Sequence, residues 1–166
     1  DLYDSPDSEA LKTDFKKAEN DAADFAQTYQ GKLDSLAKEG GGGLAEAVAS
    51  YEALQDLMGR LASYATLLYT GNTTDPERAK FYGDTQEILT RVSTGLLFFE
   101  LELNRIDDSV LDAALKDDGL AYYKPWLLDL RKERPYQLED RIEELFHEKS
   151  VTGAAAFNRL FDETMA

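Results

Sequence analysis

The stretch that decides the fold is residues 74–105, TDPERAKFYGDTQEILTRVSTGLLFFELELNR. Asp75 is a good N-cap residue, and Pro76 suits the first helical turn because its missing N–H has no intrahelical partner there. Apolar side chains then recur at helical spacing and mark one buried side: Phe81, Ile88, Val92, Leu96, Phe99 and Leu103. The stretch therefore predicts one long helix with one side in a core.

Within this helix, residues 95–103 (GLLFFELEL) are too apolar for a helix that buries a single stripe. The favoured interpretation is burial on two sides, against partner helices and against the C-terminal third of the chain. The alternative is a face that awaits another domain.

Glu100 and Glu102 interrupt this apolar run, and burial of a carboxylate without a partner is costly. Both are expected to project to water or to pair with a basic residue such as Arg60, Arg91 or Arg105. A helical-bundle enzyme with its own carboxylate site is the weaker interpretation, because a di-iron bundle needs repeated Glu-x-x-His pairs and the chain has one histidine.

Two further long helices are predicted before this stretch, over residues 44–69 and 6–30. The first has apolar residues at Leu44, Val48, Tyr51, Leu54, Met58, Leu61, Ala65 and Leu68. The second has them at Leu11, Phe15, Ala18, Ala22, Phe25 and Tyr29, a coiled-coil-like spacing. Ser5 and Pro6 are predicted to start it, and Gly31 to end it. The glycines at 40–43 are interpreted as a flexible surface connection.

The predicted fold is all-α: an elongated up-down bundle of three long helices followed by several shorter helices. Residues 1–106 form the long-helix bundle in this prediction, and residues 107–166 form shorter helices packed on it. The shorter helices are expected at 109–116, 122–133, 138–148 and 154–165, with a break at Pro135.

Composition limits the partners and the compartment. The chain has 33 acidic and 18 basic residues, a formal net charge of −15, which repels nucleic acid and anionic membrane surfaces. This charge is interpreted as a solvated acidic surface, or as adaptation to a high-salt cytosol. The absence of cysteine and of a signal-peptide pattern favours the cytoplasm.

The pair His147-Glu148 looks like the start of a zinc-peptidase motif, H-E-x-x-H. The fourth residue after His147 is Val151, and the chain has no other histidine and no cysteine. It cannot assemble a zinc ligand set by itself. No catalytic, cofactor-binding or metal-ligating residue is therefore predicted, and His147 is expected to face solvent or to cap a helix end.

Several segments together resemble the N-terminal region of oligoendopeptidase F, a family in the thimet-oligopeptidase class of zinc metallopeptidases. They are DLYDSPDSE, TTDPERAKFYGDTQEI, STGLLFFELELNRID, YYKPWLLDLRKERPYQL, LFHEKSVTG and FNRLFDETMA. The resemblance extends over essentially the whole chain, and the ordered set of segments is more specific than any one of them.

The resemblance implies a longer enzyme whose C-terminal catalytic domain, absent from this chain, carries H-E-x-x-H and zinc. That domain of the same polypeptide is the implied partner, and short peptides are the implied substrates. The N-terminal helices are implied to form a wall or lid of the substrate channel, which excludes folded proteins. No catalytic residue of the family maps onto this chain, so the chain alone is expected to be inactive. The alternative is a free-standing helical interaction module.

Overall fold

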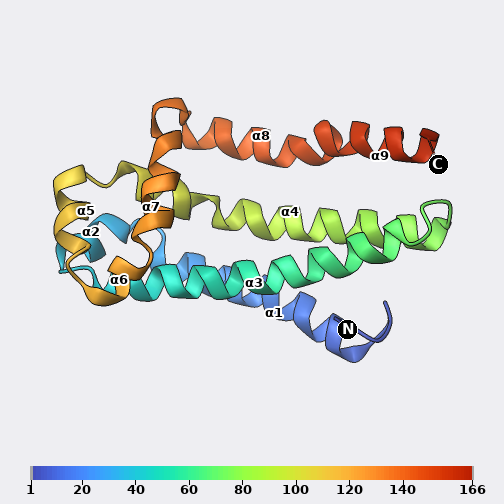
Figure 1. The fold of residues 1–166 in the computed structure, drawn as a ribbon, viewed down its shortest axis with the longest axis horizontal. Coiled ribbons are helices and arrows are strands. Elements are labelled where there is room, and N and C mark those ends of the chain that lie inside the picture. The colour runs from blue at the N-terminus through green and yellow to red at the C-terminus, as the bar shows by residue number, and fades with distance from the viewer. Residues whose placement is uncertain (1, 166) are drawn as a thin grey trace.

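The computed structural model describes residues 2–165, and within this range there is no β-strand (Figure 1). Three long helices run side by side: α1 (Glu9–Tyr29), α3 (Gly42–Thr70) and α4 (Pro76–Arg105). Successive long helices point in opposite directions (Figure 1). The predicted all-α, up-down bundle is confirmed. None of the helices in residues 2–165 combines the length and the apolarity that crossing a membrane requires.

The first helix begins later than predicted. Ser8, and not Ser5, is the N-cap, and its hydroxyl accepts a hydrogen bond from the N–H of Leu11 at 3.4 Å. Pro6 lies in a turn that is closed by the Ser8 N–H donating to the Ser5 carbonyl at 3.1 Å. The predicted start at Ser5 and Pro6 was wrong because a second capping serine follows the proline. The predicted end is confirmed, since Gly31 has φ +76 directly after the cap residue Gln30.

The glycine run is a close-packed corner, so the predicted flexible surface connection was wrong. The short helix α2 (Leu33–Lys38) precedes it, and Gly40 and Gly41 adopt φ of +108 and +91. Gly41 is buried against α5 (Asp108–Ala114), where an added Cβ would lie 2.3 Å from the Ala114 carbonyl oxygen. Glycine here supplies both a left-handed backbone and room for a second backbone.

The α4 helix follows its sequence signals. Asp75 is the N-cap, and its carboxylate accepts from the N–H groups of Glu77 at 2.9 Å and Arg78 at 3.3 Å. Phe99 and Leu101, two residues apart and so on different sides of the helix, are both buried. The predicted burial of this segment on two sides is confirmed.

The C-terminal third departs from the prediction. One helix was expected over residues 122–133, but the structure has three short elements from α6 onward: α6 (Asp118–Tyr122), α7 (Lys124–Leu130) and a 3₁₀-helix (Arg131–Tyr136). Tyr123 is the C-cap of α6 and the N-cap of α7, and Pro125 lies in the first turn of α7, where it needs no N–H partner. Pro135 lies inside the 3₁₀-helix, after which the chain turns into α8 (Asp140–Thr152).

One core joins the long and short helices. Leu111, Ala114, Leu120 and Leu127 belong to the same buried cluster as the stripes of α1, α3 and α4. The division into 1–106 and 107–166 stays a prediction, and Asp1 and Ala166 lie outside the described residues. The last two helices, α8 and α9 (Ala154–Met165), lie along α4 on the opposite side from α1 and α3 (Figure 1).

Candidate functional site

His147 lies between α8 and α4, so the predicted solvent-facing or capping histidine was wrong. Its Nε2 is 2.6 Å from the Oγ of Ser93, and the Ser93 hydroxyl donates to the Thr90 carbonyl at 3.0 Å. The hydrogen bond between these two side chains links α8 to α4.

A protein zinc site needs several side-chain ligands that converge on one point. Within residues 2–165 no group of three or more His, Cys, Asp or Glu side chains is placed to hold a metal. The histidine imidazole, the one strong nitrogen ligand in the sequence, is bound to Ser93.

Glu100 and Glu102 have hydrogen-bond donors, but these differ from the predicted arginines. The Tyr51 hydroxyl donates to Glu100 Oε1 at 2.9 Å. The Gly31 N–H donates to Glu102 Oε1 at 2.8 Å, just after the C-cap of α1. Burial and the Glu100 carboxylate raise the pKa of Tyr51 above its usual value. Glu100 therefore links α4 to α3, and Glu102 links α4 to the end of α1.

The three candidate arginines bind other carboxylates. Their partners are Asp14 for Arg60 at 3.4 Å, Glu19 for Arg91 at 2.8 Å and Asp140 for Arg105 at 3.0 Å. Sequence reasoning missed these pairs because they join side chains on different helices. Spacing along one helix does not predict such contacts.

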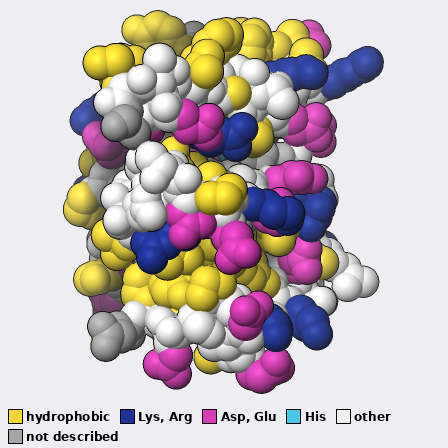
Figure 2. Space-filling model, turned by 90° about the vertical axis from the view of Figure 1, so that its right-hand side faces the viewer, with side chains coloured by type: hydrophobic (Ala, Val, Ile, Leu, Met, Phe, Trp, Pro, Cys, Tyr) yellow, Lys and Arg dark blue, Asp and Glu magenta, His cyan; other side chains and the backbone are white. Residues whose placement is uncertain are grey.

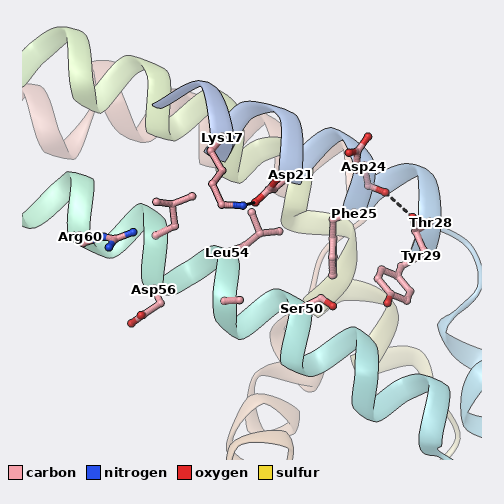
Figure 3. A pocket seen from close by; sticks show the side chains of 12 residues that line it. Lys17, Asp21, Asp24, Phe25, Thr28, Tyr29, Ser50, Leu54, Asp56 and Arg60 are labelled. Atoms are coloured by element: carbon pink, nitrogen blue, oxygen red, sulfur yellow. Dashed lines mark hydrogen bonds and ion pairs between the residues drawn. The ribbon is translucent and has the colours of Figure 1, made fainter. Parts of the chain in front are cut away.

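A groove of about 480 Å³ lies between α1 and α3 (Figure 3). Its floor is apolar and includes the buried Phe25 and Leu54. Charged side chains of both signs line it: Lys17, Asp21, Asp24, Asp56 and Arg60. Lys17 and Asp21 form an ion pair, and the Thr28 hydroxyl donates to the Asp24 carbonyl at 2.7 Å.

The groove combines an apolar floor with polar and charged side chains. The Ser50 hydroxyl, like that of Thr28, donates to a backbone carbonyl, in this case that of Glu46 at 2.9 Å. An apolar floor with donors and acceptors on the rim suits an extended polar chain.

The outer side of α8 and α9 is apolar and uncovered. Its exposed large side chains, with Leu138 just before α8, form what we call the α8–α9 face: Leu138, Ile142, Leu145, Phe146, Phe157, Leu160, Phe161 and Met165. Phe157 and Phe161 are 71% and 64% exposed. Figure 2 looks onto the end of the molecule at which α9 ends, and hydrophobic side chains cover much of its upper edge, over α9.

The orientation of α8 explains this exposure. Half-buried Glu143, His147 and Val151 recur every four residues and mark the side toward α4. The large apolar residues of α8 share one side of the helix, and the structure turns that side away from the bundle. A group of eight large, exposed apolar side chains on two consecutive helices is typical of protein interaction sites.

Fold and surface define an all-helical module with an exposed apolar face. In the comparison with known families, residues 102–166 match the family model described as Oligopeptidase F. The matched part is less than half of the chain and runs from the last turn of α4 through α9. The predicted resemblance to the N-terminal region of oligoendopeptidase F is thus confirmed over these residues. No curated protein and no solved structure matches the chain.

Proposed function

We propose that this chain is the noncatalytic N-terminal helical portion of a zinc-dependent oligoendopeptidase F. The observation that carries the proposal is the Oligopeptidase F match over residues 102–166, the same region that contains the α8–α9 face. In this proposal, the α8–α9 face packs against the catalytic part of the same polypeptide. Zinc and the peptide-cleaving residues belong to that part.

The bundle would serve as one wall or lid of the substrate channel. Helix α4 has 30 residues, so it extends for about 45 Å at about 1.5 Å per residue. A rigid wall of this length excludes folded proteins and admits short, unstructured peptides. The groove between α1 and α3 is compatible with peptide contact, because its rim offers donors and acceptors. The cytoplasm remains the proposed compartment, on the absence of cysteine.

Hydrogen exchange tests the packing of the α8–α9 face. The backbone amides of residues 154–165 would be measured in this chain and in the intact gene product. We expect fast exchange in the chain alone and strong protection in the intact enzyme, because docking covers Phe157 and Phe161. Amides of α3 serve as the control, and they should exchange equally in both proteins. Equal, fast exchange of residues 154–165 in both would contradict the proposal.

The same uncovered face also favours the second candidate, a free-standing interaction module. Sedimentation of the chain separates the two. A dedicated module that pairs through Phe157 and Phe161 should be dimeric at low concentration, and Phe161→Glu should make it monomeric. A peptidase portion should be monomeric or only weakly self-associating.

A further inference from the structure

A small aromatic pocket lies where α3 meets the junction of α6 and α7. Its volume is about 280 Å³, and its lining residues are Val48, Tyr51, Glu52, Gln55, Tyr123 and Trp126. The first four recur at helical spacing on α3, and the last two come from the α6–α7 corner. The pocket lies outside the α1–α3 groove and the α8–α9 face.

Three aromatic rings form the walls of this pocket. The ring centroids of Tyr51 and Trp126 are 6.1 Å apart. Tyr51 is held from behind by Phe99, with ring centroids 4.6 Å apart, and it is 8% exposed. Tyr123 lies at the helix junction and is half-buried. The core therefore holds the Tyr51 ring in place, and the junction of α6 and α7 holds the Tyr123 ring.

Carboxylates hold both tyrosine hydroxyls. Tyr123 donates to Glu52 Oε2 at 2.7 Å, and Tyr51 donates to Glu100 Oε1 at 2.9 Å. The hydrogen bond to Glu52 and burial raise the pKa of the Tyr123 phenol. Among the six described residues that line the pocket, none is positively charged. Negative charge therefore lies beside aromatic faces whose own potential is negative.

We propose that this pocket binds organic ammonium cations. Aromatic faces attract a cation through their quadrupoles, with tryptophan the strongest, and they also cover its alkyl groups. The Glu52 carboxylate at the rim supplies negative charge, and the oxygen of the Gln55 amide accepts from an N–H donor. A bare metal ion is a poorer occupant, because it requires several converging oxygen or nitrogen ligands and most of the lining is apolar. This inference is independent of the peptidase proposal.

Trp126 is the chain's one tryptophan, so its fluorescence reports this pocket directly. The chain would be titrated with choline at constant ionic strength, and separately with the neutral isostere 3,3-dimethylbutan-1-ol. We expect a saturable change with choline and about tenfold weaker binding of the alcohol. A blocked lysine, Nα-acetyl-lysine methylamide, distinguishes a lysine side chain from a quaternary ammonium as the preferred source of the cation.

Matched variants connect the binding to the pocket. Glu52→Gln and Tyr123→Leu should each weaken choline binding by about five- to tenfold. Asp56→Asn is the control, since Asp56 lies one helical turn from Glu52 but lines the α1–α3 groove, and it should leave the affinity unchanged. Gln55→Glu adds a carboxylate to the lining and should tighten binding, which keeps the test informative if Tyr123→Leu disturbs the fold.

Two outcomes would overturn the proposal. Equal affinity for choline and its neutral isostere would make the pocket a purely apolar one. The other is a fluorescence change that rises linearly with choline concentration without saturating, and that Glu52→Gln and Asp56→Asn reduce equally. It would mean that choline binds non-specifically to the acidic surface. Circular dichroism of each variant confirms that its helices are intact.

Discussion

Single residues fix the corner at which α2, α3 and α5 meet. Gly41 combines a φ of +91 with close contact to the Ala114 backbone, so a side chain meets two obstacles there. By contrast, Gly59 lies on the exposed side of α3 with no atom within 4 Å of an added Cβ. Gly41 is the N-cap of α3 and Gly59 lies within the same helix, so the two positions can be compared directly by substitution.

We expect Gly41→Ala to lower the free energy of unfolding by about 2–4 kcal/mol, from backbone strain and overpacking. Gly59→Ala should raise it by about 0.5–1 kcal/mol, because alanine is the better helix former. Urea denaturation followed by circular dichroism measures both. If Gly41→Ala proved neutral, the close contact with Ala114 would be wrong.

Tyr3 gives a prediction at alkaline pH. Burial and its 2.7 Å hydrogen bond to Asp14 raise the pKa of Tyr3 from 10.0 to about 12. The unfolded chain therefore loses this proton first, so the free energy of unfolding contributed by Tyr3 is present below pH 10 and falls as pH rises toward 12. The Tyr3→Phe variant should show a shallower fall over this range in urea melts. A tyrosine of unshifted pKa, by contrast, would leave the slope unchanged.

At the scale of elements, the helices differ in how much they depend on the core. Helix α4 places six large apolar side chains in the core, with Phe99 at 0% exposure, whereas α8 and α9 contain no buried residue. Their stability in this chain comes from one side of α8 and its contacts with α4.

Phe161→Glu should therefore change the free energy of unfolding by no more than about 0.5 kcal/mol. The comparison variant Phe99→Ala should cost about 3–5 kcal/mol through the cavity that it leaves. Thermal and urea melts of both variants check this difference. A large loss of stability in Phe161→Glu would mean that the α8–α9 face is covered within this chain.

The long helices were predictable because periodicity and local caps act within a few residues of each other. The stripes of α1, α3 and α4 and the Asp75 cap all have this local character. The division at Tyr123 was missed, although Pro125 is a local signal, because a proline is equally compatible with the first turn of one longer helix.

The site was less predictable than the fold. A pattern tells which side of α8 is apolar, but it does not tell whether that side faces the bundle. The aromatic pocket was missed for a similar reason, since Tyr51 and Trp126 are far apart in sequence and meet only through the path of α6 and α7. Tertiary contacts between distant segments leave no local signal.

At the scale of the whole molecule, net charge sets the response to salt. The formal charge of −15 destabilises the compact state through self-repulsion, and the ion pairs between exposed side chains offset little of it. We expect Tm to rise from low salt to 1 M KCl, where the Debye length is about 3 Å. Calorimetry at several KCl concentrations measures this rise. A flat or falling Tm would show that local ion pairs outweigh the net charge.

The short connection between α3 and α4 has a kinetic consequence. Residues 71–75 join two helices that pack along their length, so this hairpin closes a small loop and needs little chain entropy to form. The corner at Gly41 and Ala114, in contrast, joins segments more than seventy residues apart. We therefore expect the α3–α4 hairpin to form the folding nucleus, with φ-values well above those at the glycine corner. A chain emerging from the ribosome would therefore complete the α3–α4 hairpin before the helices from α5 to α9 are synthesised.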